Sequence, residues 1–184
     1  LIILISFAST AQDFMTIGEV FDFNVNDEFH FRGQGGNQPP NADRITIIDK
    51  YYSENSDTVH YVRFHDSYWT SPLDYPPYIE YHFSTETDTV FYTNLNLDIT
   101  SYGSWTVYDP EMVSYDTIIN YSEYYCDSLI NGYQYEINDF EPVYFSNQFG
   151  KGLGLVKQYM YDPVEFFEMD IVLFYYNRNG LGCG

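Results

Sequence analysis

Hydrophobic and polar residues alternate along most of this chain, and short polar or glycine-rich stretches separate the alternating runs. Within Val20–Val25, Phe21 and Phe23 alternate with Asp22 and Asn24. A period of two is typical of a strand with one buried face. The same reading predicts further strands over Glu28–Phe31, Arg44–Tyr52, Thr58–His65, Tyr78–Phe83, Thr89–Leu97, Trp105–Tyr108, Ile130–Ile137, Val143–Ser146, Leu153–Tyr161 and Met169–Tyr176.

The segments between these runs carry turn residues. Asn26–Asp27, Ser53–Asp57 and Ser84–Asp88 predict tight turns, and Gly33–Asn41 predicts a loop without apolar residues. Three prolines in Ser71–Pro77 predict a break in the chain. Many short strands joined by short turns predict an all-β fold, an antiparallel meander forming either a sandwich or a strongly curved half-barrel.

At most one short helix is expected, and the sequence leaves its existence open. In Met112–Tyr125, Asp109 could cap a helix with Pro110 at its first position, but the many β-branched and tyrosine residues favour a strand.

The first residues have the character of an export signal. Leu1–Ser6 is an apolar run, and Ser9 and Ala11 occupy the −3 and −1 positions of a signal-peptidase site. We expect residues 1–11 to be part of a signal peptide and residues 12–184 to form a single β-rich domain. The alternative is that the apolar run is a buried first strand. The run is too short to span a bilayer, so no transmembrane segment is expected in the mature chain.

Charge and aromatic content narrow the class of protein. The 184 residues include 27 acidic and 7 basic side chains, a formal net charge of −20. Binding that neutralises phosphates needs the opposite sign, so no nucleic-acid partner is expected. Aromatic residues make up 21% of the chain, which a disordered acidic segment would lack. Aromatic side chains on a solvent-exposed face of a sheet could stack on sugars or peptides.

Cys126 and Cys183 are the two cysteines. In an oxidising compartment an even number favours a disulfide, here one that ties the last strand to the middle of the domain. The alternative is a pair of free thiols.

Candidate chemistry is sparse, and we expect no catalytic residues, no metal site and no cofactor. The histidines (His30, His60, His65 and His82) lack zinc-site spacing. Five carboxylates are candidates for a hydrolase pair, and nothing in the sequence selects among them: Glu80, Glu136, Glu141, Glu165 and Glu168. Gly150–Gly154 lacks the spacing of a phosphate loop, so its glycines predict a bend or a close approach of a strand.

Four tripeptides have the form Asp-Ser/Thr-apolar, a pattern that resembles the O-glycosylation signal of exported Bacteroidota proteins. The candidate acceptors are Thr58, Thr89, Thr117 and Ser128. The alternative is structural, because Asp commonly ends a turn and Thr-Val commonly begins a strand.

Two segments near the C-terminus, Phe149–Val156 and Ile171–Gly180, resemble the closing strands of uncharacterised exported Bacteroidota β-domain proteins, and Val20–Phe29 is similar to their opening strands. A type IX secretion sorting domain often follows such domains. The resemblance implies an exported protein at the cell surface or in the medium, and it implies no activity.

These observations favour a secreted or cell-surface binding or adhesion domain that is not an enzyme, with a glycan or surface protein as its partner. One alternative is a carrier that holds an apolar ligand in a curved half-barrel. A second alternative is a hydrolase with a carboxylate pair.

Overall fold

The structure is a computed structural model that describes residues 14–35, 41–72, 79–101, 119–126, 128–137, 143–162 and 167–184. The expected signal peptide, residues 1–11, lies outside the described residues. The helices and strands of the structure, in chain order, are α1 (Ile17–Val20), β1 (Glu28–Gly35), β2 (Asn41–Tyr52), β3 (Thr58–Pro72), β4 (Ile79–Thr93), the 3-10 turn η1 (Ile99–Ser101), β5 (Ile119–Tyr125), β6 (Ser128–Ile137), β7 (Val143–Gly150), β8 (Gly154–Asp162), β9 (Phe167–Arg178) and β10 (Leu181–Cys183).

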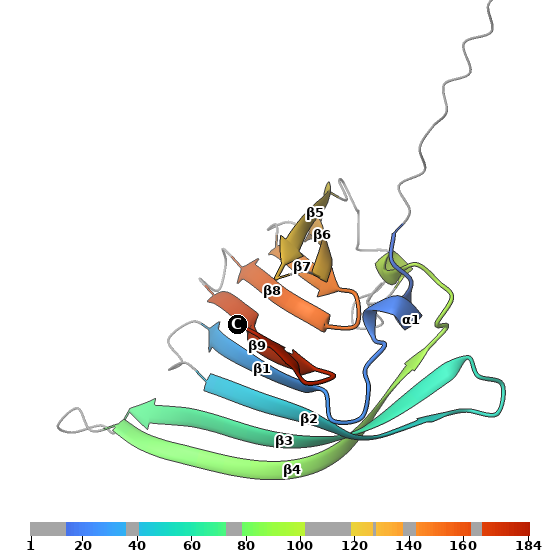
Figure 1. Ribbon diagram of the computed structural model, residues 1–184. Helices are drawn as coiled ribbons and strands as arrows, with labels where there is room; N and C mark the ends of the chain where they lie inside the picture. Colours follow the sequence, from blue (N-terminus) through green and yellow to red (C-terminus); the bar gives the residue numbers. More distant parts are fainter. Residues whose placement is uncertain are drawn as a thin grey trace, which may run out of the picture.

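The strands form one open antiparallel sheet in the order β4-β3-β2-β1-β9-β8-β7-β6-β5, with β10 paired to β9 (Figure 1). Strands β1–β4 make one meander and β5–β9 a second, and the pairing of β1 with β9 joins them. The all-β antiparallel fold is therefore confirmed. The curved single sheet was one of the two expected architectures, and the described strands do not form the two-sheet sandwich.

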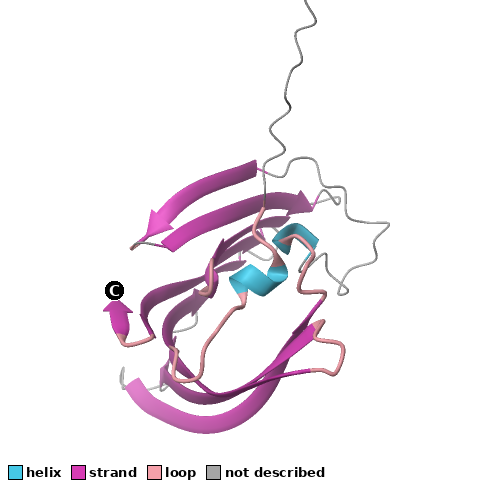
Figure 2. Ribbon diagram, turned by 45° about the vertical axis from the view of Figure 1, so that its right-hand side comes forward, coloured by secondary structure: helices cyan, strands magenta, loops and turns pink. Residues whose placement is uncertain are grey.

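The sheet curls strongly, so that its two outer parts face one another across the short helix (Figure 2). Register shifts occur at His30/Phe31, at Ile47/Asp49 and at Gln148/Phe149. A β-bulge increases local twist and bends its strand, so these shifts contribute to the curl of the sheet.

The hydrophobic core lies on the concave side, between the sheet and α1. Ile17 and Val20 of α1 and Ile99 of η1 are buried there against strand residues such as Val59 and Leu173. Backbone hydrogen bonds hold the helix in place, because the N–H groups of residues 17 and 18 donate to the carbonyl oxygens of residues 97 and 95 at 2.8 Å.

The helix was not expected at this position, and Val20–Val25 was wrongly predicted to be a strand. Burial does alternate, since Phe21 and Phe23 are buried and Asp22 is exposed. However, this segment has no strand ladder: Tyr61 Oη donates to the carbonyl of Phe21 (2.6 Å) and accepts from the N–H of Phe23 (3.2 Å). A side chain from β3 thus replaces a neighbouring strand.

A sequence signal for α1 was present and was not recognised. Thr16 and Glu19 form a capping box, with the Thr16 hydroxyl accepting from Glu19 N–H and the Glu19 carboxylate accepting from Thr16 N–H. The Thr16 N–H, and after it Lys151, lower the pKa of Glu19. Four residues are too few to show helical periodicity, so only the capping motif could have revealed the helix.

The predicted turn at Ser84–Asp88 is also wrong. These residues lie inside β4, a continuous strand of 15 residues that pairs along its whole length with β3. β4 is an edge strand and most of its side chains are exposed, so its polar residues reflect solvent contact and not a turn.

The glycine-rich segment forms the β7–β8 turn and approaches the α1 region closely; the sequence predicted a bend or a close approach here, but not the α1 region as the neighbour. Gly154 has a φ of +69°, and a Cβ atom there would lie 2.9 Å from Phe23 Cζ. Gly152 has a φ of +63° and donates its N–H to the Glu19 carbonyl at 2.8 Å. The glycines thus serve packing between the hairpin and the α1 region.

We expect Gly154→Ala to lower the free energy of unfolding by about 2 kcal/mol, because it combines a left-handed backbone with a close contact to Phe23. Urea unfolding measures this. Gly180→Ala is the matched control, since Gly180 has a φ of +79° and nothing lies within 4 Å of an added Cβ. Equal losses in both variants would show that packing against Phe23 contributes nothing.

Candidate functional site

The concave side of the sheet holds a partly open cavity of about 620 Å³. Its walls come from both meanders and from the segment between α1 and β1. The lining residues are Phe21, Phe23, Phe29, Phe31, Asp43, Ile45, Ile47, Arg63, His65, Tyr92, Asn147, Phe149, Leu153, Gly154, Leu155, Gln158 and Ile171. This volume lies within the range of about 300–1,000 Å³ that is typical of small-molecule sites.

One end of the cavity, beside the α1–β1 segment, is apolar and built from packed aromatic rings. Phe21 stacks on Tyr92 with ring centroids 3.8 Å apart, and the Phe23 centroid lies 5.0 Å from that of Phe29. Phe149 meets Phe21 edge to face at 6.2 Å. These contacts between rings hold the side chains of the apolar end in position.

The other end carries polar side chains, which we call the polar rim: Asp43, Arg63, His65, Asn147 and Gln158. Strand register explains the change in polarity. On β3, Val59 and Tyr61 are buried in the core, and the same face continues to Arg63 and then His65. The cavity is therefore amphipathic along the direction of the strands.

An ion pair between neighbouring strands holds the arginine of the polar rim. Arg63 on β3 lies directly opposite Asp88 on β4, and its Nε donates to Asp88 Oδ1 at 3.0 Å while Nη2 pairs with Oδ2. The hydrogen bond from Arg63 lowers the pKa of the Asp88 carboxyl below its ordinary value of 3.8.

This pair should make stability depend on pH in the acid range. Because the pKa of Asp88 is lower in the folded state than in the unfolded state, its stabilising contribution is present above about pH 4 and is lost as the pH falls through the folded-state pKa. A double-mutant cycle of Arg63→Gln and Asp88→Asn should give a coupling below about 1 kcal/mol at neutral pH, since Asp88 is partly exposed. The coupling should shrink as urea titrations approach pH 2, and a coupling independent of pH would contradict the assignment.

Hydrogen bonds from two side chains attach the segment between α1 and β1 to the sheet. Tyr61 bonds its backbone at Phe21 and Phe23, and burial raises the pKa of the Tyr61 hydroxyl, which stays a donor. Lys50 donates to the Phe23 carbonyl (2.8 Å) and to Asp22 (2.9 Å). Burial is the largest single influence on the pKa of Lys50 and lowers it, but the bond to Asp22 and the interactions with Tyr61 and Tyr52 together raise the lysine pKa above its ordinary value. The apolar end of the cavity is thereby fixed in position.

A buried carboxylate anchors the start of β1 to the end of β9. Asp27 is 1% exposed and accepts from the N–H of Asn24 (2.8 Å) and from Arg178 Nε (3.3 Å). Arg178 also donates to the carbonyls of Asp22 and Lys151. The predicted turn at Asn26–Asp27 is present, with Asn26 at a φ of 73°, and it serves this anchor.

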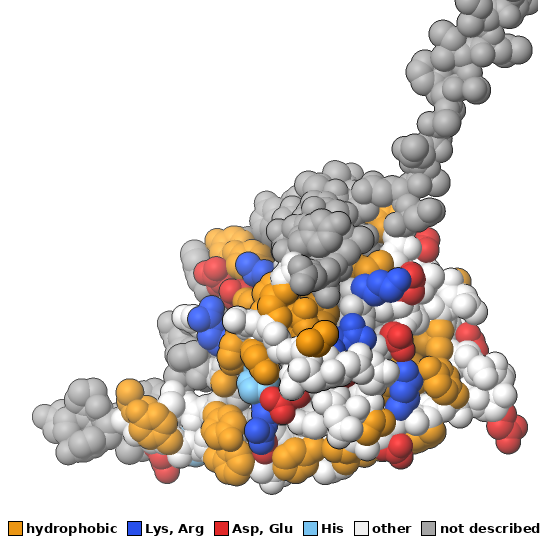
Figure 3. All heavy atoms as spheres, in the orientation of Figure 1, with side chains coloured by type: hydrophobic (Ala, Val, Ile, Leu, Met, Phe, Trp, Pro, Cys, Tyr) orange, Lys and Arg blue, Asp and Glu red, His pale blue; other side chains and the backbone are white. Residues whose placement is uncertain are grey.

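Exposed aromatic rings form a second feature, on the β3–β4 ribbon. Trp69 stacks on His82 with centroids 5.2 Å apart, and Tyr68 lies 4.9 Å from Phe83. Tyr81 is 81% exposed. Hydrophobic side chains also reach the surface along this edge in Figure 3. The β3–β4 register places Trp69 and His82 on one face of the ribbon and Tyr68, Phe83 and Tyr81 on the other, and we call these five residues together the aromatic ribbon patch.

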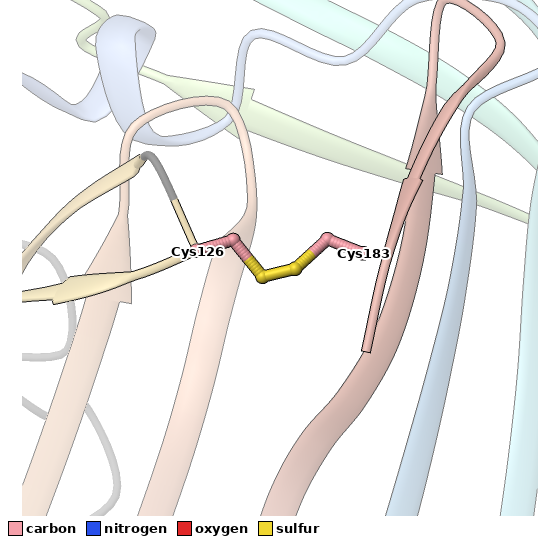
Figure 4. Close-up of a disulfide and its surroundings, with 2 residues drawn as sticks. All are labelled: Cys126 and Cys183. Carbon is pink, nitrogen blue, oxygen red and sulfur yellow. A yellow bond between two sulfur atoms is a disulfide. The ribbon is translucent and has the colours of Figure 1, made fainter.

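The expected disulfide joins Cys126, in the β5–β6 turn, to Cys183 on β10 (Figure 4). The two Cα atoms lie 6.5 Å apart, within the span that a disulfide bridges. Tyr125 and Tyr176 approach beside the bond, with ring centroids 6.0 Å apart. The bond links two hairpins that are not neighbours in the sheet, and so it fixes the curl on this side.

The candidate glycosylation acceptors are scattered over the sheet. Thr58 begins β3 and is half-buried, whereas Thr89 is exposed in the middle of β4. Ser128 begins β6, and its side chain is not among those described. Thr117 lies outside the described residues. Modification at these positions stays a prediction, with Thr89 the most accessible of the described acceptors.

The candidate carboxylates for hydrolysis do not line the cavity where their side chains are described. Glu80 is exposed on β4, 3.7 Å from His82, and Glu168 is exposed on β9. Glu141 and Glu165 lie outside the described residues, and the side chain of Glu136 is not described. In the described part of the chain, no three His, Cys, Asp or Glu side chains gather as a metal site would require.

The polar rim itself was not predicted from the sequence. His65 was considered only as a metal ligand, and Arg63 and Asp88 are far apart in sequence. Their approach follows from the β3–β4 register, which the wrongly predicted turn at Ser84–Asp88 concealed. Alternation of Tyr61, Arg63 and His65 along one strand face was the signal that could have found the rim.

Comparison with known proteins gives likenesses of chain fold at low identity. No protein-family model matches the sequence, and no curated protein matches it. A structure of a protein inferred to be exported, with a YmcC-like fold, from Bacteroides fragilis is similar at a TM-score of 0.47 and 10% identity over 86% of this chain and 98% of that one. A structure of an inferred lipoprotein from Parabacteroides distasonis is similar at a TM-score of 0.41 and 12% identity over 88% and 98% of the two chains.

Among the residues described here, no helix has the length and apolar character needed to cross a bilayer.

Proposed function

We propose that this chain is an exported binding protein without catalytic activity, which holds a small ligand with an apolar body in the concave cavity of its sheet. The observation that carries the proposal is the 620 Å³ cavity with an aromatic end. Of the functions expected from the sequence, this is the carrier alternative.

The shape of the fold supports a ligand site at this place. The sheet is strongly curved, while α1 has only four residues and packs at one end of the concave face. Ile17 and Val20 fill that end together with Ile99. The described helices are too short to cover the rest of the concave face, where the cavity lies.

The apolar wall gives the expected driving force. A ligand chain placed against Phe23, Phe29 and Ile47 would transfer from water to an apolar surface. The side chains of that surface are already buried and packed. Each buried methylene contributes about 0.8 kcal/mol, so a ligand with several methylenes gains useful affinity before any polar contact forms.

A fluorescent probe tests the site. N-phenyl-1-naphthylamine, whose emission rises in apolar surroundings, should bind the oxidised protein at one site. Ile171→Trp projects into the cavity and should weaken this binding at least tenfold. Val172→Trp is the matched control, because it lies on the other face of the same strand and does not line the cavity. Equal binding by both variants would refute the cavity as the site.

The aromatic ribbon patch favours a second candidate function, the binding of a glycan or surface protein. Stacked rings such as the exposed Trp69 on the half-buried His82 offer flat apolar faces that suit sugar rings. A glycan array tests this candidate. Binding that Trp69→Ala abolishes and Ile171→Trp leaves unchanged would support it.

A further inference from the structure

Resting on the proposed function, we infer that the ligand is a long-chain amphipathic molecule with an uncharged, hydroxyl-bearing headgroup, and that this headgroup lies at the polar rim. The inference concerns the chemistry of the ligand and its direction in the cavity. It follows from the polarity, the charges and the hydrogen-bonding groups of the rim.

The direction of the ligand follows from the order of side chains along the strands. On β2 the inner face runs from Ile47 through Ile45 to Asp43. On β7 it runs from Phe149 to Asn147. Both series pass from the aromatic end to the polar rim. A ligand chain therefore extends towards Phe23, and its head remains between the two meanders at the rim.

The charges at the rim disfavour an anionic head. Arg63 is the one lysine or arginine among the residues that line the cavity, and Asp88 already holds its guanidinium through two contacts. Asp43, which accepts from Ser67 Oγ at 2.6 Å, adds a negative charge to the same side. A carboxylate or phosphate would have to compete with Asp88 and approach Asp43, in a protein of net charge −20.

The hydrogen-bonding groups of the rim suit an uncharged head. His65 Nε2 is buried and has no hydrogen-bond partner among the described residues. A buried polar atom of this kind costs about 1–3 kcal/mol unless something bonds it. Imidazole can donate or accept, and across the cavity the amides of Asn147 and Gln158 do both. A hydroxyl group, which also donates and accepts, complements this set.

Three probes of equal chain length test the headgroup: dodecanol, dodecanoate and dodecylamine. Each is titrated against protein loaded with N-phenyl-1-naphthylamine, at low and at high salt, because salt removes non-specific attraction of the amine to the acidic surface. We expect dodecanol to displace the probe at concentrations at least tenfold below dodecanoate. At high salt it should also displace better than dodecylamine. Dodecanoate binding as well as dodecanol, or dodecylamine binding best at both salt concentrations, would overturn the inference.

A pair of histidine variants tests the position of the head. His65→Phe keeps a planar ring but removes the buried nitrogen, and should weaken dodecanol about tenfold while the binding of the naphthylamine probe persists. His60→Phe is the matched control, because His60 lies on the opposite face of β3 and stacks on Tyr51. An unchanged dodecanol affinity in His65→Phe would overturn the placement. Failure of the naphthylamine probe to bind the wild type would instead refute the proposed function itself.

Discussion

Reduction of the Cys126–Cys183 disulfide is expected to lower the free energy of unfolding by about 4 kcal/mol. The bond closes a loop with a sequence separation of 57 residues, and the chain-entropy model gives this magnitude for a loop of that length. The structure adds a second reason. The bond joins the β5–β6 turn to β10, so without it the β5–β6 hairpin is held at the sheet edge by its pairing with β7.

Urea unfolding of the oxidised protein, of the protein in reductant and of the double variant Cys126→Ser/Cys183→Ser measures this effect. The reduced protein and the double variant should agree, since both lack the bond. The double variant should not respond to reductant. Two titratable thiols in the protein purified from an oxidising compartment, or identical stability with and without reductant, would contradict the assigned bond.

Tyr61→Phe is expected to cost about 3 kcal/mol, although it removes a single oxygen atom. The hydroxyl is buried, donates to the Phe21 carbonyl at 2.6 Å and accepts from the Phe23 N–H at 3.2 Å. Without this acceptor the buried Phe23 N–H has no hydrogen-bond partner, and its desolvation penalty destabilises the folded state. The hydrogen bond to the Phe21 carbonyl is lost as well. Because this segment forms the aromatic end of the cavity, binding of the naphthylamine probe should weaken too.

Tyr51→Phe is the control for this substitution, because Tyr51 is 46% exposed on the same sheet. Its free energy of unfolding should change by less than about 0.5 kcal/mol. If Tyr61→Phe changes the free energy of unfolding equally little, the two hydrogen bonds of the Tyr61 hydroxyl do not stabilise the α1–β1 segment.

The sequence predicted the strands that have one apolar and one polar face. It was wrong for an exposed edge strand and for a segment whose hydrogen-bond partner is a side chain. β2, β8 and β9 lie close to their expected ranges because apolar and polar residues alternate along them, and β6 also lies close to its expected range. β4 was divided by a false turn because an exposed edge strand has polar residues on both faces. The segment at Val20–Val25 alternates in burial as a strand would, but its partner is the Tyr61 side chain.

The disulfide could be predicted and the cavity could not. Two cysteines allow a single intramolecular pairing, so the count gave the pair, with free thiols as the alternative, and the structure has the bond. The polar rim combines residues of β2, β3, β7 and β8, which meet only because β1 pairs with β9 and the sheet curls. Neither the β1–β9 pairing nor the bulges leave a local pattern that fixes them in advance.

The most direct test of the account is a crystal structure of the oxidised protein with dodecanol that carries bromine on its terminal carbon. The anomalous signal locates one atom of the ligand. We predict a bromine peak at the aromatic end, between Phe23, Phe29 and Phe149, with the hydroxyl at the polar rim near His65. A bromine peak on the aromatic ribbon patch, or none in the cavity of a protein soaked to saturation, would contradict a ligand-holding function for the curved sheet.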